Sequence, residues 1–241
     1  MKKDNIYAKP IDKVSDFEFN EQVSSVFDDM IKRSVPGYNS INNLLKVIAK
    51  HNVQKNTHIY DLGCSLGSSS IAILQGAKGK GCNFIAVDLS DSMITHCKRN
   101  LKPYFENEKI EILCEDIRNI HFTNANLVIL NFTLQFIPKN DRNNLICKIK
   151  NGMVDNGILI LSEKIQFEDP QYRHQINTLH NTFKKKNGYT DLEISQKRTA
   201  LEKVLTPETI NNHHQRLTNA GFRSVQTWFQ YLKLLDHYED Q

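Results

Sequence analysis

A glycine-rich turn followed by an aspartate offers the clearest chemistry in the sequence. The turn is Asp61-Leu62-Gly63-Cys64-Ser65-Leu66-Gly67, and it lies between an apolar segment and a predicted helix. Glycine there lets the backbone approach a ligand, and a helix N-terminus favours polar or anionic groups. Asp88 follows 21 residues after Gly67, where a carboxylate can accept hydrogen bonds from both ribose hydroxyls. The combination favours nucleoside binding over a purely structural turn.

Two more polar residues occupy places where such a site takes its ligand. Asp116 and Asn131 each follow a predicted strand, and open parallel sheets bind ligands beyond the carboxyl ends of their strands. The Asp116 carboxylate can accept a hydrogen bond from the exocyclic amine of adenine. The alternative for both Asp116 and Asn131 is a structural role as a helix cap or a turn residue. Asp61 suits either an ammonium partner or a role in fixing the backbone.

Strands and helices alternate through the middle of the chain. Apolar segments predict strands over 58–62, 83–88, 109–114, 126–131 and 158–162. Helices are predicted over 68–75, after a Ser90 cap, and over 139–153, before the turn signal Asp155-Asn156-Gly157. Strands that are apolar throughout are covered on both faces. The alternation therefore predicts an α/β, Rossmann-like fold, with a central, mostly parallel sheet and helices on both faces.

Both ends of the chain and one insertion depart from this alternation. Residues 1–57 predict an N-terminal arm and two helices, with Pro36-Gly37 between the helices and Ser40 as the second N-cap. The first helix is predicted from one apolar stripe, formed by Val23, Val26, Phe27, Met30 and Ile31. A polar helical insertion covers about 168–205, and Thr206-Pro207 starts a last helix before two strands. We expect the arm to pack on one α/β domain over 58–241.

The composition excludes several classes of protein. The 39% of apolar residues provide a sizeable core, which excludes a disordered chain. No apolar run approaches the roughly 18 residues of a membrane span, and the first residues predict no secretory signal. Five cysteines without a C-x-x-C pair favour reduced thiols in the cytoplasm.

Charge and histidine placement give further expectations. The net charge of +4 is too dispersed to predict direct nucleic-acid binding, and Lys184-Lys185-Lys186 predicts a solvated helix face. No carboxylate and histidine cluster has metal-ligand spacing, so we expect no metal. The scattered histidines, among them His174 and His180, predict surface or capping roles.

The sequence resembles the class I S-adenosylmethionine (SAM)-dependent methyltransferases, which carry an acidic residue and G-x-G-x-G after their first strand. Ser65 stands at the middle glycine. A more specific resemblance is to the carboxy-S-adenosyl-L-methionine (carboxy-SAM) synthase family, whose pattern Ser65 matches. That resemblance rests on Ser34-Val35-Pro36-Gly37-Tyr38, Tyr60 to Gly67, Leu130-Asn131-Phe132-Thr133-Leu134-Gln135-Phe136, Leu192-Glu193-Ile194-Ser195-Gln196-Lys197-Arg198 and Trp228-Phe229-Gln230.

The resemblance implies an activity. The family converts SAM and prephenate to carboxy-SAM and phenylpyruvate, through a SAM ylide that captures carbon dioxide, with the hydroxide lost from prephenate as the proposed base. The product supplies a tRNA carboxymethyltransferase that completes 5-oxyacetyluridine at the tRNA wobble position. The resemblance also implies a homodimer. Its ligand contacts fall on Tyr38, Gly63, Cys64, Ser65, Asp88, Leu89, Asp116, Ile117, Asn131 and Arg198.

The resemblance implies a catalytic role for Arg198. Methyl transfer needs no fixed cation at the methyl group, whereas a new carboxylate there calls for a bidentate guanidinium. Two alternatives stay open: an ordinary small-molecule methyltransferase, and a non-catalytic SAM-binding partner of a tRNA-modifying enzyme.

Overall fold

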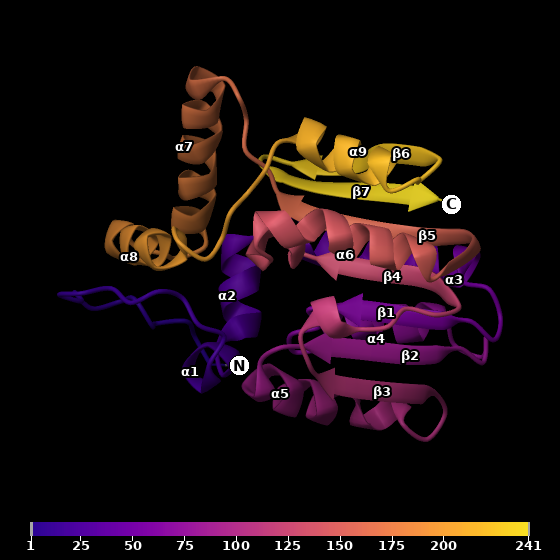
Figure 1. Ribbon diagram of the computed structural model, residues 1–241. Coiled ribbons are helices and arrows are strands. Elements are labelled where there is room, and N and C mark those ends of the chain that lie inside the picture. The colour runs from indigo at the N-terminus through magenta and orange to yellow at the C-terminus, as the bar shows by residue number, and fades with distance from the viewer. Residues whose placement is uncertain (1, 241) are drawn as a thin grey trace.

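A single sheet organises the molecule. The computed structural model describes residues 2–240, and side chains over 2–234. Within that range the sheet has seven strands in the order β3-β2-β1-β4-β5-β7-β6 (Figure 1). β1 to β5 run parallel, and β7 is antiparallel to both β5 and β6. The strands are β1 (His58–Leu62), β2 (Asn83–Asp88), β3 (Lys109–Cys114), β4 (Ala125–Asn131), β5 (Met153–Lys164), β6 (Ser224–Tyr231) and β7 (Leu234–Asp240).

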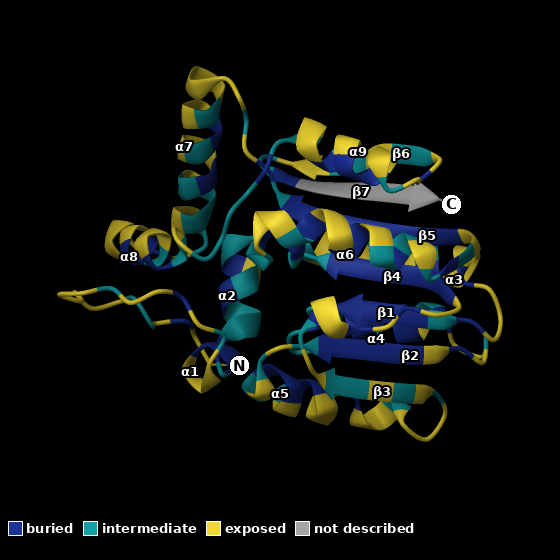
Figure 2. Ribbon diagram, in the orientation of Figure 1, coloured by how far each residue is buried: buried dark blue, intermediate teal, exposed yellow. Residues whose placement is uncertain are grey.

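Alternate residues of the central strands build a core on each face of this sheet. Ile59 of β1 packs on one side with α3 (Tyr38–Asn52), α4 (Ser68–Gly76) and α5 (Asp91–Leu101). Leu62 packs on the other side with α6 (Lys139–Asn151) and α9 (Ile210–Asn219). β4 is buried along nearly its whole length, as Figure 2 shows. The predicted Rossmann-like class with helices on both faces is confirmed.

The predicted helix starts are right at Ser68, at Lys139 and after Ser90, and wrong in two other cases. Ser90 caps α5, because its hydroxyl accepts a hydrogen bond from the Met93 amide. The second N-terminal helix begins at Tyr38 rather than after Ser40, since Gly37 adopts a left-handed conformation that turns the chain there. The last helix begins at Ile210 and is capped by Thr209, because residues 206–208 are held extended by backbone bonds to Gln135 and Gln166.

Two local patterns fold differently from their prediction. The apolar stripe after residue 20 forms α1 (Glu21–Ser24) and α2 (Phe27–Ser34), separated by a non-helical Val26. The break lets both Val23 and Val26 enter a cluster with Phe17. The turn signal at 155–157 lies inside β5, where Asn156 has a φ of 57° and the register with β4 shifts. It is therefore a bulge, which needs the same left-handed residue as a turn.

The insertion and the N-terminal arm meet at one end of the sheet. α7 (Pro170–Lys186) and α8 (Asp191–Leu201) project from it, and the arm runs beside α8 (Figure 1). The Gln196 side chain of α8 donates to the carbonyls of Tyr7 and Lys9, and accepts from the amide of Ile11. Thus two segments that are distant in sequence are joined. No helix of residues 2–240 is long and apolar enough to cross a membrane.

Candidate active site

A cavity of about 820 Å³ lies at the carboxyl ends of β1, β2 and β4. Its volume falls in the upper part of the range for small-molecule sites. Aromatic side chains from the arm and from the loop after β4 form one wall, and Phe19 and Phe136 meet edge to face with centroids 5.2 Å apart. The cavity is lined by all ten residues predicted for the site: Tyr38, Gly63, Cys64, Ser65, Asp88, Leu89, Asp116, Ile117, Asn131 and Arg198.

The glycine turn holds the floor of the cavity in a fixed shape. Gly63 and Cys64 both donate their amides to the Val87 carbonyl, at 2.8 and 2.9 Å. Gly63 has a φ of 79°, and a Cβ at that position would lie only 2.3 Å from the Thr133 hydroxyl. Gly63 is therefore needed for the contact between this turn and the loop after β4, as well as for an open ligand surface.

Asp88 is anchored by both of its carboxylate oxygens. Oδ2 accepts from the Ser65 amide and Oδ1 from the Ser90 amide, each at 2.9 Å. Burial raises the pKa of Asp88, and these two amides act in the opposite direction. Each oxygen keeps a further lone pair, so the carboxylate can bind two hydroxyl groups from a fixed position.

Asn131 lines the cavity and keeps one side-chain acceptor unused. Its amide nitrogen donates to the Ser69 hydroxyl at 2.8 Å, while its Oδ1 is buried and has no hydrogen-bond partner among the described residues. A buried polar atom without a partner costs about 1–3 kcal/mol. A ligand that donates a hydrogen bond here, such as an ammonium group, would remove that cost.

Asp116 combines the two roles that the sequence left open. It caps a short 3-10 helix, η2 (Ile117–Asn119), by accepting from the Arg118 amide at 2.9 Å. The Arg118 guanidinium also binds its carboxylate, at 2.6 Å to Oδ2, and lowers the pKa of Asp116. Asp116 lines the cavity with this partner in place. Any ligand amine must therefore share the carboxylate with Arg118.

The remaining predicted contacts supply mainly apolar surface. Leu89 is 72% exposed, and Ile117 is buried. These two side chains offer apolar surface at the side of the cavity formed by β2 and β3. Tyr38 is half-buried, and burial raises its pKa. The Cys64 thiol lies 3.8 Å from the Cys97 sulfur, and its pKa is raised, so it is a neutral packing group.

Asp61 lies beneath the site rather than in it. Its carboxylate accepts a hydrogen bond from the Ser70 hydroxyl at 2.5 Å, and the residue is 1% exposed and absent from the cavity lining. The sequence left two roles open for Asp61, an ammonium partner or a residue that fixes the backbone. The contacts support the second role, because they join β1 to α4. Burial raises the pKa of Asp61 to about 6.

This pKa predicts a pH dependence of stability. Between the ordinary pKa of 3.8 and about 6, the folded state binds more protons at Asp61 than the unfolded state does. Stability therefore falls as pH rises through this window, by about 2–3 kcal/mol. In urea denaturation, the free energy of unfolding of Asp61→Asn should gain that amount relative to the wild type between pH 4 and pH 7. A constant difference would contradict the assignment.

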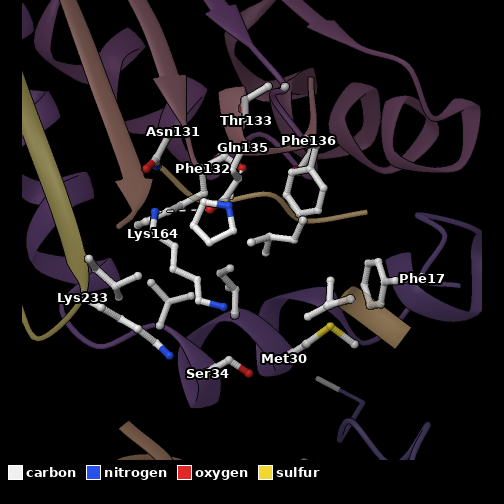
Figure 3. Close-up of a pocket in the computed structure, with 18 of the residues that line it drawn as sticks. Phe17, Met30, Ser34, Asn131, Phe132, Thr133, Gln135, Phe136, Lys164 and Lys233 are labelled. Carbon is white, nitrogen blue, oxygen red and sulfur yellow. Dashed lines mark hydrogen bonds between the residues drawn. The ribbon is translucent and has the colours of Figure 1, made fainter. Parts of the chain in front are cut away.

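Several lysines were missed as site residues. Lys164 ends β5, Lys184 lies on α7, and Lys233 precedes β7; all three line the cavity. In Figure 3, Lys164 and Lys233 extend toward the same region, near Ser34 of α2. The prediction of a solvated face for 184–186 is wrong for Lys184, whereas Lys185 is exposed and paired with Asp191 at 2.6 Å. The strand-end rule that selected Asn131 also applies to Lys164.

His180 is likewise not a surface residue. It is buried, lines the cavity, and its Nε2 donates to the Ser34 carbonyl at 2.8 Å. Burial, followed by nearby Lys184 and Lys233, lowers the pKa of His180 to about 2, so the ring is neutral at pH 7. Among the described residues, no group of three or more His, Cys, Asp or Glu is placed to hold a metal ion.

The strand order, and the glycine turn at the point between β1 and β4 where that order reverses, define a class I methyltransferase fold. A family model described as a methyltransferase domain matches residues 59–157. Magnesium protoporphyrin IX methyltransferase from Synechocystis, solved with bound SAH, has a TM-score of 0.61 at 15% identity, covering 88% of this chain and 87% of that one. Human N-acetylserotonin methyltransferase, solved with SAM, has a TM-score of 0.60 at 15% identity. There the match covers 92% of this chain but only 55% of the human one.

Comparison of sequences narrows this class to one family. A carboxy-S-adenosyl-L-methionine synthase of Shewanella oneidensis is 50% identical over 227 residues, covering 94% of this chain and 93% of that protein. One from Shewanella baltica is 49% identical over 230 residues, covering 95% of each. The chain therefore belongs to the carboxy-S-adenosyl-L-methionine synthase family, and it is an enzyme.

Proposed function

We propose that this enzyme makes carboxy-SAM from SAM, with prephenate as the source of the carboxyl group and phenylpyruvate as the second product. The observation that carries the proposal is the separation of charge within one cavity. Asp88 and Asn131, whose buried Oδ1 has no partner among the described residues, line the part formed by the glycine turn and the strand ends. Arg198 and four lysines, Lys164, Lys184, Lys197 and Lys233, line the part under the insertion. A cationic sulfonium ligand and an anionic partner thus each find a complementary surface.

In this proposal the predicted contact residues bind different parts of the SAM molecule. Asp88 accepts the ribose hydroxyls, and Asn131 Oδ1 accepts from the ammonium group. Leu89 and Ile117 enclose the adenine ring, with Asp116 at its amine. Tyr38 and the backbone of Gly63, Cys64 and Ser65 complete the contacts. The site needs no metal in this scheme.

The reaction balances without any further reactant. Prephenate loses carbon dioxide and hydroxide and becomes phenylpyruvate. The hydroxide takes a proton from the SAM methyl group and becomes water, and the methyl carbon forms a new bond to the carbon dioxide. The protein's part is to hold both reactants in contact and to exclude water. The aromatic wall of Phe17, Phe19 and Phe136 provides that exclusion.

Mass spectrometry of the small molecules formed by purified protein tests the proposal. Incubation with SAM and prephenate should yield a species 44 mass units heavier than SAM, which is the mass of carbon dioxide, together with phenylpyruvate. Transfer of labelled methyl to an acceptor, with no heavier species, would indicate an ordinary methyltransferase instead. Binding of SAM without any turnover would indicate a non-catalytic partner.

Arg198→Lys tests how the new carboxylate is held. Lysine keeps the charge but loses the planar fork that matches a carboxylate. Affinity for carboxy-SAM should therefore fall by roughly 1.5–3 kcal/mol, the scale of a charge-assisted hydrogen bond, while affinity for SAM should change little. Calorimetry with both ligands measures the difference. An equal loss for both ligands, or none for either, would remove Arg198 from this role.

We also propose the wider setting that the family membership suggests. The enzyme acts as a homodimer in the cytoplasm and supplies a tRNA carboxymethyltransferase that completes the wobble uridine, without itself binding tRNA. We treat 58–241 as one SAM-binding domain, on which the arm and helices of 1–57 pack. Light scattering should give twice the mass of the 27.9 kDa chain. A salt-resistant, submicromolar complex with tRNA would contradict the proposed division of labour.

A further inference from the structure

Besides Arg173 and Lys197, which bind other groups of the protein, the part of the cavity under the insertion is lined by four cations from four different elements. They are Lys164 on β5, Lys184 on α7, Arg198 on α8 and Lys233 in the turn before β7. The three lysines are half-buried. Among the described residues, no carboxylate forms an ion pair with any of the four. Like charges gathered in a partly desolvated space repel one another, so this arrangement favours a bound anion.

The groups around these lysines do not neutralise them. Lys233 donates to the Asn177 side-chain oxygen at 2.6 Å, which is a neutral acceptor. His180 is held neutral, and Lys197 is already engaged by Asp4 at 3.7 Å and by the Ser34 hydroxyl at 3.1 Å. Glu202, the acidic residue of α8's C-terminal end that lines the cavity, is exposed. The positive charge is therefore left for a ligand.

The lowered pKa values of Lys184 and Lys233 are consistent with other cations lying near them. Burial first, and then Lys164, Lys197 and Arg198, lower the pKa of Lys184 to about 7. Burial, Lys164, Lys184 and Arg198 lower the pKa of Lys233 to about 7. An anion that binds between them would restore their protonation. The charge lies inside a cavity rather than along an open surface, which fits a small anion rather than a nucleic acid.

We propose that Lys164, Lys184 and Lys233 form a second anion subsite, distinct from Arg198, that binds the carboxylate which the co-substrate keeps after the reaction. This rests on the proposed function, in which the co-substrate has two carboxylates and transfers one. Arg198 faces the carboxylate that moves to SAM, and the lysines hold the one that leaves on the keto-acid product. Two fixed points orient the co-substrate against the methyl group. The enzyme is thereby specific for a dicarboxylate.

Binding of phenylpyruvate is the sharpest test, because this product carries only the retained carboxylate. Lys184→Gln and Lys233→Gln should each weaken phenylpyruvate binding at pH 7 about tenfold or more, and should raise the KM for prephenate more than they lower kcat. SAM affinity should stay within about twofold. Lys184→Arg, which keeps the charge, should retain most of the affinity. Lys185→Gln is the matched control, since this neighbour is exposed and paired with Asp191.

The pH profile gives a second readout. Because Lys184 and Lys233 lose their protons near pH 7, phenylpyruvate binding should weaken as pH rises from 7 to 9, and the slope should flatten in Lys184→Gln. Unchanged phenylpyruvate affinity and prephenate KM in both glutamine variants would overturn the subsite. If the wild type formed no carboxy-SAM, the proposed function would be overturned instead. The two outcomes can be told apart, because equilibrium binding of phenylpyruvate is measured without turnover.

Discussion

Replacing Gly63 by valine is expected to abolish SAM binding and to destabilise the protein by about 2–5 kcal/mol. Valine at a φ of 79° is strained, and its Cβ would overlap the Thr133 hydroxyl and methyl groups, which lie 2.3 and 2.6 Å from that position. The loop after β4 must then move; it begins directly after Asn131 and carries Phe132 and Thr133, and all three residues line the cavity. Calorimetry should show no SAM binding, and urea denaturation should show the lower stability.

Gly79→Val is the matched control for this experiment. Gly79 has a φ of 75°, but a Cβ there would meet nothing within 4 Å, so valine adds strain without a clash. We expect a smaller loss of stability and unchanged SAM binding. If Gly63→Val kept full SAM affinity, the turn would be structural and the ligand would bind elsewhere.

Asp88→Ala should weaken SAM binding about 30- to 1,000-fold, which corresponds to the loss of about 2–4 kcal/mol from two charge-assisted hydrogen bonds. Part of the loss arises within the protein, because the amides of Ser65 and Ser90 also lose their acceptor. The fold should survive, since Asp88 ends β2 and is only half-buried. Titration calorimetry measures the affinity, and circular dichroism checks the fold.

Asp88→Asn separates the charge from the shape. Asparagine keeps one acceptor oxygen but places a donor against one of the two backbone amides. We expect an intermediate loss of affinity. If Asp88→Ala bound SAM as tightly as the wild type, the residue would have no part in ligand binding.

The central sheet was predictable because each strand there is locally specified. β1, β2 and β3 have the predicted bounds, since their apolar segments are flanked by polar or glycine-containing turns. The strand-end rule also brought Asp88, Asp116 and Asn131 to one cavity. The fold class and the cavity that the predicted residues line therefore followed from short patterns. Their ligand contacts stay predictions.

The rest depended on contacts between distant segments. The triple lysine at 184–186 has no local feature that separates Lys184 from Lys185; only the packing of α7 beside α2 and α8 does so. The bulge at Asn156 has the composition of a turn, and pairing with β4 decides between the two. Burial of Asp61 and His180 likewise depends on packing that the sequence does not encode locally.

The joining of the arm to α8 has a consequence for how the chain matures on the ribosome. The contact between Ile11 and Gln196 spans 185 residues, so the arm lacks its docking site until nearly the whole chain has been translated. At 5–20 residues per second this delay is roughly 10–40 s. Throughout it, Phe17, Val23 and Val26 have no Ala200 to pack against. A nascent chain is thus expected to present a chaperone-recognisable apolar segment at its leading end, and to acquire a complete cavity only as synthesis finishes.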